Sequence, residues 1–376
     1  MRCRKWLGEG SLFLLAGLMW CGSLTQAGEP PQKTQAPEAR RPERHLTNVR
    51  QLTFGRKNAE AYFSFDGNKL IFQSTNNWMK DSFAATLKPA DVGLDCYQIY
   101  VMDLESDTIR LVSTGTGATT CGYFFPGDRR VLYSSTHLKG PNCPPEPKRE
   151  GTYRWALDDY DLFAVRIDGQ EMQRLTTTPG YDAEATVSPD GKTIVWTSVR
   201  DGDLDIYAMN LDGTKIRRLT TDIGYDGGAF FSPDSKRIVY RASHPTDPAD
   251  VTRYKELLAQ HLVEPGQLEI FVMNADGSGQ HQVTANGASN FAPYFHPDGR
   301  RIIFSSNVET RGDGGRPNFH LYLMSEDGTG LERLTFEGQF NSFPMFSPDG
   351  KRLVWVSDRN AKQPREFNVF IADWAP

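Results

Sequence analysis

The stretch Val187–Ser198 reads VSPDGKTIVWTS, and its central phrase returns as FSPDS at Phe231, FHPDG at Phe295 and FSPDG at Phe346. An Asp-Gly pair supplies the positive φ angles that a tight hairpin turn needs, and β-branched or aromatic residues alternate beside it. The stretch therefore predicts two antiparallel strands joined by a short turn, and its recurrence predicts a repeated unit.

The spacing of these turns identifies the unit. Their aspartates, Asp66, Asp128, Asp190, Asp234, Asp298 and Asp349, are separated by 62, 62, 44, 64 and 51 residues. The shortest step is the bare unit, and the longer steps are the same unit with insertions. A period of roughly 40 to 50 residues in β-rich sequence is typical of propeller blades, each a four-stranded sheet.

The unit from Asp182 to Thr221 shows four strand-like segments, AEATVS, KTIVWTS, DIYAMN and IRRLTT, with a second Asp-Gly turn before the last. The C-terminal unit has three such segments, whereas VRQLTF at 49–54 is a strand without a blade. The sequence therefore predicts an all-β, six-bladed β-propeller over residues 47–376, closed by the N-terminal strand, which leaves no exposed sheet edge.

The N-terminus has the features of an export signal. Arg2, Arg4 and Lys5 precede the apolar run 11–22, and Ala27 follows as a small residue before a cleavage point. We expect a signal peptide over 1–27, a Pro-rich disordered linker over 28–46, and a periplasmic or secreted protein. Lipid attachment at Cys21 stays open.

The phrases SPDGK, IYAMN and RRLTT resemble the repeats of the TolB-like propellers, which also occur in prolyl oligopeptidase relatives and oligogalacturonate lyases. The resemblance covers Val49 to Trp374. It implies the propeller fold and a role in binding, here without the N-terminal domain of TolB and without a peptidase domain.

Composition and motifs limit the classes of partner and of chemistry that this protein can have. A net charge of −5 and a pI near 5.9 give no basic field for nucleic acid or an anionic membrane. No apolar run, including that of the signal, is long enough to span a bilayer. There is no G-x-S-x-G, H-E-x-x-H, haem, P-loop or G-x-G-x-x-G motif. We therefore expect no cofactor and favour a binding protein over an enzyme.

Strand direction places the two short turns of every blade on one face, which we call the hairpin face. The inserted loops 76–96, 137–159, 244–267 and 307–320 then share the opposite, loop-elaborated face. The third loop contains a short amphipathic helix pattern with Leu257, Leu258 and Leu262 after an Asp cap.

Polar residues recur where the innermost strands enter from this face: Asn58, Thr119, Asp182, Asp226, Asn290 and Asn341. Aromatic residues (Tyr181, Tyr225, Phe291, Phe340, Phe343) flank them, and Glu60 and Glu184 lie two positions further in. This set predicts a site for a carbohydrate, peptide or protein ligand at the channel mouth. The alternatives are that the Asp and Asn side chains only cap loop amides, or that they hold Ca²⁺.

Cys96, Cys121 and Cys143 all fall on the loop-elaborated face of adjacent blades. In an exported protein two of them are expected to form a disulfide, with Cys96 and Cys143 preferred because both lie in insertions. A Zn²⁺ site from the three cysteines and His137 is the alternative.

Two functions follow. The first is non-catalytic binding of a ligand or protein partner on the loop-elaborated face. The second is a carbohydrate-active enzyme resembling oligogalacturonate lyases, with Glu60, Glu184 or His137 as acid or base.

Overall fold

The computed structural model describes residues 42–75, 96–148, 153–309 and 318–376. The expected signal peptide 1–27, Cys21 and residues 28–41 of the expected linker lie outside the described residues, as do residues 76–95 and 310–317 of the predicted loops.

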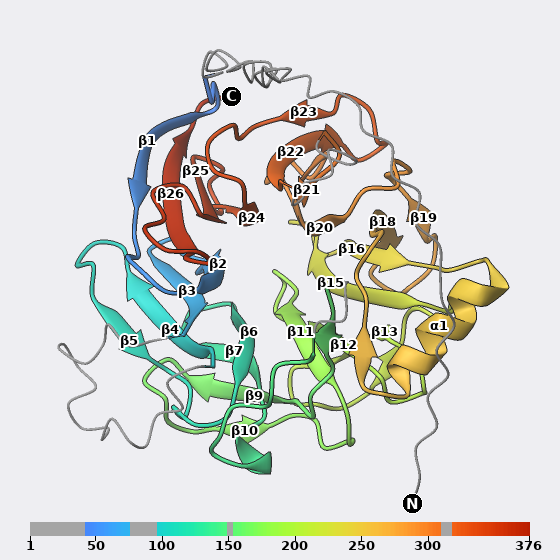
Figure 1. The fold of residues 1–376 in the computed structure, drawn as a ribbon. Coiled ribbons are helices and arrows are strands. Elements are labelled where there is room, and N and C mark those ends of the chain that lie inside the picture. The colour runs from blue at the N-terminus through green and yellow to red at the C-terminus, as the bar shows by residue number, and fades with distance from the viewer. Residues whose placement is uncertain (1–41, 76–95, 149–152, 310–317) are drawn as a thin grey trace, which may run out of the picture. The chain divides into compact units, whose positions relative to one another are not determined.

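In these residues the chain forms six four-stranded antiparallel sheets arranged around a central axis (Figure 1), which confirms the predicted six-bladed propeller. The blades, each given from the innermost strand outward, are the following: blade 1, β2 (Asn58–Phe63), β3 (Lys69–Ser74), β4 (Gln98–Asp103) and β5 (Ile109–Leu111); blade 2, β6 (Thr119–Phe124), β7 (Arg130–Ser135), β9 (Asp161–Arg166) and β10 (Gln173–Arg174); blade 3, β11 (Asp182–Val187), β12 (Thr193–Ser198), β13 (Asp205–Asn210) and β14 (Arg217–Arg218); blade 4, β15 (Tyr225–Phe231), β16 (Arg237–Ser243), β18 (Glu269–Asn274) and β19 (His281–Gln282); blade 5, β20 (Asn290–Phe295), β21 (Arg301–Ser306), β22 (His320–Ser325) and β23 (Glu332–Arg333); and blade 6, β24 (Asn341–Phe346), β25 (Arg352–Ser357), β26 (Asn368–Trp374) and β1 (Leu46–Gln51).

The ring closes through its two ends, as the sequence predicted. β1 pairs with β26 in antiparallel register, with Leu46 opposite Trp374 and Gln51 opposite Phe370. The segment just before β1 is also anchored, because the carboxylate of Glu43 accepts two 3.0 Å hydrogen bonds from the guanidinium of Arg359. Ordered contacts therefore begin within the last residues of the expected linker.

The core consists of large side chains on the second and third strands, packed between neighbouring blades. Trp196 lies opposite Tyr207 in blade 3 and Trp355 lies opposite Phe370 in blade 6, with ring centroids 5.7 and 5.8 Å apart. Both tryptophans are fully buried, and burial of one such side chain contributes about 2–3 kcal/mol.

The phrase Leu-Thr, which ends four units and is replaced by Val-Ser in blade 1 and Val-Thr in blade 4, has a structural cause. In blade 3 the hydroxyl of Thr220 accepts a 2.9 Å hydrogen bond from the amide of Ile206, where the short fourth strand leaves the sheet. Equivalent bonds of 2.8–3.0 Å occur in the other five blades, to Thr53, Ser113, Thr176, Thr284 and Thr335. A small hydroxyl is needed there because the amide is buried.

The predicted helix is present as α1 (Pro248–Leu258), and Asp247 caps it by accepting a hydrogen bond from the amide of Ala249. Leu257 is buried as expected. Leu262 is not on the helix, because it begins the short strand β17 (Leu262–Val263).

Candidate functional site

Every innermost strand carries one irregularity at the same position. The antiparallel register shifts there, and the residue at the shift has a left-handed backbone with φ between 50° and 60°. The six residues, which we call the channel ring, are Glu60, Cys121, Glu184, Gly228, Ala292 and Phe343. A bulge of this kind bends a strand and redirects a side chain. The fold therefore turns one residue per blade toward the axis.

All six ring residues line one cavity of about 30 Å³. Tyr62, Ala185, Thr186, Phe230 and Arg241 complete its wall. A space of this size holds only one or two groups as large as a water molecule. The cavity can therefore hold the end of a ligand but cannot enclose a whole ligand.

Glu184 is the centre of a polar cluster in this wall. Its carboxylate accepts hydrogen bonds from the hydroxyls of Tyr225 (2.8 Å) and Thr197 (2.9 Å) and from the amide of Gly228 (2.9 Å). Arg241 donates to the same carboxylate and, at 2.7 Å, to the Tyr225 hydroxyl. Burial alone would lower the pKa of Arg241, but the Glu184 carboxylate raises it, so the guanidinium stays charged.

Two consecutive glycines make room for this cluster. A Cβ on Gly227 would lie 2.4 Å from Glu184 Oε2, and one on Gly228 would lie 2.6 Å from Arg241 Nη1. Both contacts are closer than carbon can approach. Sequence reasoning missed Arg241 and the glycine pair, although a blade-by-blade alignment would have shown a charged residue and a Gly-Gly pair where other blades have neither.

Glu60 lies in the same cavity without a cation. Its Oε2 is buried and has no hydrogen-bond partner among the described residues. Burial raises its pKa to about 7, and the nearby Glu184 carboxylate acts in the same direction. The neighbouring thiol of Cys121 is buried too, and burial together with Glu60 raises the pKa of Cys121 well above its usual value.

The polar residues predicted at the channel mouth occupy a different place. Asn58, Thr119, Asp182, Asp226, Asn290 and Asn341 are all buried at the start of the innermost strands. Asp182 accepts hydrogen bonds from the Trp196 indole (2.9 Å) and the Arg200 guanidinium (3.0 Å) within its own blade. The contacts of Asp226, Asn290 and Asn341 are likewise with neighbouring strands and loops. The backbone amides of all six residues donate hydrogen bonds to carbonyls of the neighbouring blade, and none of the six residues lines the cavity.

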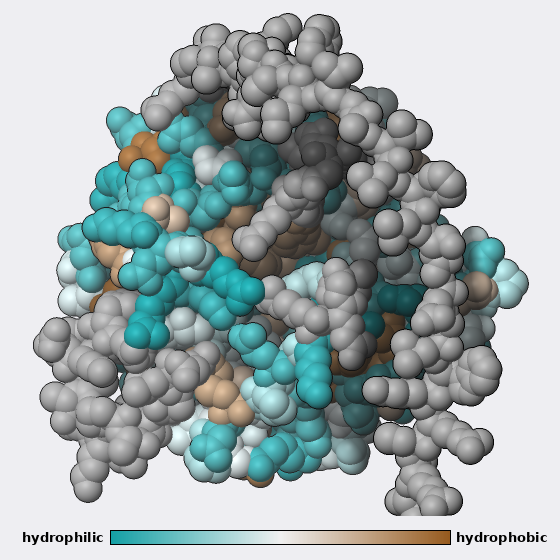
Figure 2. Space-filling view, viewed as in Figure 1, coloured by the Kyte–Doolittle hydropathy of each residue, from teal (hydrophilic) through white to brown (hydrophobic). Residues whose placement is uncertain are grey.

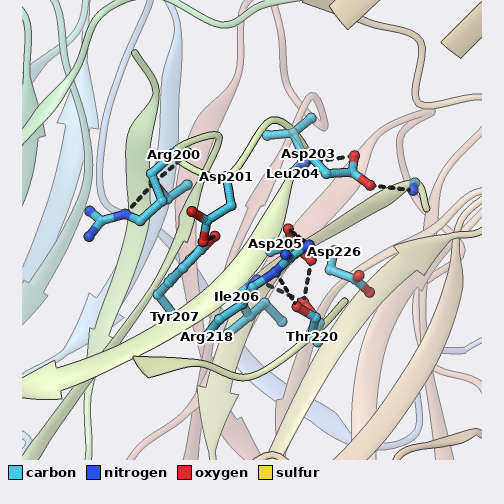
Figure 3. Close-up of polar contacts among 12 residues, drawn as sticks. Arg200, Asp201, Asp203, Leu204, Asp205, Ile206, Tyr207, Arg218, Thr220 and Asp226 are labelled. Carbon is cyan, nitrogen blue, oxygen red and sulfur yellow. Dashed lines mark hydrogen bonds and ion pairs between the residues drawn. The ribbon is translucent and has the colours of Figure 1, made fainter. Parts of the chain in front are cut away.

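Two such junctions bring two carboxyls together: Asp161 and Asp182 between blades 2 and 3, and Asp205 and Asp226 between blades 3 and 4. Asn290 donates a 2.9 Å hydrogen bond to Glu269 of the preceding blade, whereas the equivalent residues Asp226 and Asp205 are both carboxyls. Figure 3 shows this pair beside Thr220, with Arg218 forming an ion pair to Asp205 at 2.6 Å. Burial raises the pKa of Asp205 to about 7 and also raises that of Asp226.

Aromatic side chains form the wall on the side of blades 5 and 6. Phe291 packs edge-on against Phe319 and Phe343, with ring centroids 5.0 and 5.9 Å apart, and Phe340 contacts Phe367 at 4.8 Å. These five rings keep partial exposure. Figure 2 shows hydrophobic surface inside the hollow at the centre of the face in view. Of the predicted aromatic residues, Phe291, Phe340 and Phe343 belong to this wall.

Tyr181 and Tyr225 lie on the other side. Tyr225 is buried and bonded to Glu184, while Tyr181 is partly buried and packs against Tyr160. Neither tyrosine lines the cavity, but Tyr225 contributes to the polar cluster through its hydrogen bonds with Glu184 and Arg241.

Two insertions meet above blade 3. The strand β8 (Trp155–Ala156) from blade 2 pairs with β17 from blade 4, and Arg154 binds Glu264 at 2.8 Å. Trp155 lies over the Arg241 guanidinium at 5.3 Å. The insertions are therefore coupled to the polar cluster.

The structure joins Cys96 and Cys143 by a disulfide with Cα atoms 5.5 Å apart. This bond removes two of the four ligands that a Zn²⁺ site with Cys121 and His137 would need. His137 packs on Phe163 and does not line the cavity. In the described part of the chain, no three His, Cys, Asp or Glu side chains are grouped for a metal ion.

A larger groove, of about 830 Å³, lies on the hairpin face between blades 4 and 5. Its charged groups already have partners: Arg237 pairs with Glu326 and Asp298 with Arg301. We place the candidate site in the channel because one residue from each of the six blades lines that cavity.

Comparison with known proteins agrees with this architecture. The family model for the TolB beta propeller domain matches residues 138–255 and 254–374. The chain belongs to the TolB β-propeller family. A provisionally named TolB from Agrobacterium tumefaciens has a solved structure that covers 85% of this chain and 91% of its own, with a TM-score of 0.54 and 22% identity, which supports the fold.

Curated relatives of this TolB-like propeller match over shorter stretches. The Tol-Pal system protein TolB of Helicobacter hepaticus is 33% identical over 24% of this chain and 21% of its own length. An uncharacterized protein of Agrobacterium fabrum is 30% identical over 27% and 33%. The matched part of the chain thus spans between about a fifth and a third of these relatives. The described residues include no helix with the length and apolar character of a membrane span.

Proposed function

We propose that this protein is an exported, periplasmic or secreted binding protein whose ligand or protein partner engages the loop-elaborated face and inserts a group into the channel cavity. The observation that carries the proposal is the convergence of one residue from each of six blades on a single polar cavity. Export rests on the signal-like N-terminus.

The chemistry of the wall favours binding over catalysis. The carboxylate of Glu184, a candidate acid or base, already accepts hydrogen bonds from Tyr225, Gly228 and Arg241. These bonds leave no position from which it could exchange a proton with a substrate. The phenylalanines of blades 5 and 6 offer flat apolar surface across the channel from the polar cluster. This combination suits a peptide or a carbohydrate. The proposal requires no cofactor and no nucleic acid.

Site-specific photo-crosslinking in the native host tests this. A benzoylphenylalanine at Tyr153, which is 58% exposed on the loop-elaborated face, should capture a partner. The matched control is Met172, 39% exposed in a hairpin-face turn. Equal capture from both positions, or from Met172 alone, would contradict the proposal.

A second function has one observation in its favour. The pKa of Glu60, raised to about 7, suits a general acid near neutral pH. If the protein is instead a carbohydrate-active enzyme, it should degrade an acidic or neutral oligosaccharide, and Glu60→Gln should abolish turnover without unfolding the protein. Absence of turnover on a broad oligosaccharide panel would leave binding as the function.

A further inference from the structure

The charges around the channel cavity do not balance. Two carboxyls, Glu60 and Glu184, face one guanidinium, Arg241, and that guanidinium is bonded to Glu184. Arg241 also contacts the rings of Trp155 and Tyr225, whose centroids lie 5.3 and 5.5 Å from its Cζ. Among the described residues, no cation forms an ion pair with Glu60. One negative charge in the cavity thus lacks a counter-charge from the protein.

We propose that the cavity receives one primary ammonium group on an unbranched alkyl chain, as a lysine side chain carries, and that Glu60 is its counter-charge. This inference rests on the proposed function and names the chemistry of the inserted group.

The size and the lining of the cavity select this group. About 30 Å³ admits an ammonium, which is close to water in size, but not the wider planar guanidinium of an arginine. Tyr62, Phe230 and Phe343 supply aromatic surface to the same cavity, and a cation is attracted to such faces. A hydroxyl would fit equally well by size, but it would leave the charge of Glu60 uncompensated.

In the empty protein, a proton takes the place of this cation. Burial raises the pKa of Glu60 to about 7, so the carboxyl is largely protonated below that pH. Binding then exchanges one cation for another: the ammonium forms an ion pair with the Glu60 carboxylate, and the carboxyl proton is released to solvent.

The other groups near Glu60 do not obscure this exchange. They are Tyr62 on its own strand, Cys121 on β6, Glu184 on β11, Arg241 on β16, and Tyr97 and Tyr160 near the channel. Burial raises the pKa values of Cys121 and the three tyrosines, so these groups stay neutral near pH 7. Arg241 stays charged throughout.

Calorimetric titration of the mature protein with Nα-acetyl-lysine methylamide and with cadaverine tests the proposal. Because Glu60 goes from about a tenth to about nine tenths ionised between pH 6 and pH 8, affinity should rise about tenfold over that range, with release of up to one proton. The analogue with a hydroxyl in place of the ε-ammonium, which keeps the length and width of the chain but carries no charge, should bind at least tenfold more weakly at pH 8. If only the lysine analogue binds, the natural ligand is a polypeptide. If both amines bind, the site recognises the ammonium group alone. Either result supports the inference.

Glu60→Gln should remove the pH dependence and weaken binding at least tenfold, whereas Glu146→Gln, a 75% exposed carboxyl outside the cavity, should change neither. Equal binding of the hydroxyl analogue by the wild type would overturn the inference without recourse to any variant. So would binding of glucosamine in preference to both alkyl amines, or no binding of any amine. If amines fail while photo-crosslinking from Tyr153 succeeds, the ammonium assignment is wrong and the proposed binding face stands. If amines bind but Tyr153 captures nothing, the ammonium assignment stands and the proposed binding face is wrong.

Discussion

Substitution of Gly228 by alanine tests whether the polar cluster depends on the missing side chain. The new Cβ would lie 2.6 Å from Nη1 and 2.9 Å from Cζ of Arg241, at a φ of +60°. The rings of Trp155 and Tyr225, with centroids 5.3 and 5.5 Å from Cζ, limit how far the guanidinium can move away from the new Cβ. It must therefore separate from Glu184, and both side chains are about nine-tenths buried.

The cost can be divided into two parts. A left-handed alanine costs about 1–2 kcal/mol, and breaking a buried ion pair costs about 3–5 kcal/mol, so we expect a loss of about 4–7 kcal/mol in the free energy of unfolding. Gly191→Ala isolates the first part, because Gly191 has a φ of +68° and its nearest neighbour to a new Cβ is Pro126 at 3.5 Å. That variant should lose only about 1–2 kcal/mol.

Urea unfolding followed by tryptophan fluorescence measures both variants. In an Arg241→Met background, which removes the clashing atoms, Gly228→Ala should cost no more than Gly191→Ala does. If Gly228→Ala and Gly191→Ala are equally destabilising in the wild-type background, the steric argument for the glycine pair is wrong.

Three further predictions concern the junctions, the cysteines and the closure. Asp226→Asn should raise the free energy of unfolding by about 1 kcal/mol at pH 8, because it replaces a carboxyl pair by the amide–carboxyl pairing seen at Glu269 and Asn290. The folded-state pKa values of Asp226 and Asp205 lie above their unfolded values, so the stability that their protonation provides is lost as pH rises toward 7. The stability gained by Asp226→Asn should therefore vanish near pH 4, where both carboxyls are protonated in the wild-type fold. A gain that is equal at pH 4 and pH 8 would contradict this account. Thiol titration of the denatured, unreduced mature protein should find one reactive thiol, Cys121, and three after reduction; three before reduction would exclude the disulfide. A chain that starts at residue 52 lacks β1 and exposes the edge of β26, so it should aggregate or unfold without cooperativity, and a sharp thermal transition equal to that of the full mature chain would refute closure by β1.

The sequence alone determined the architecture, because that information is local and repeated. Asp-Gly turns, alternating strands and the spacing of Asp66, Asp190 and Asp349 specify blades, and the unpaired strand at 49–54 specifies closure. The pairing of β1 with β26 confirms that reasoning. The helix cap at Asp247 could also be predicted from the sequence, because capping depends on a few adjacent residues.

The site was decided by tertiary structure. Counting from the turn correctly gave equivalent positions in every blade, but a bulge in each innermost strand turns Glu60 and Glu184 toward the axis and leaves Asp182 and Asn341 buried in the junctions. A one-residue shift of register exchanges the two faces of a strand, and composition does not reveal it. Arg241 reaches Glu184 across 57 positions of sequence and across a blade boundary, so its role follows only from the packing of one blade on the next.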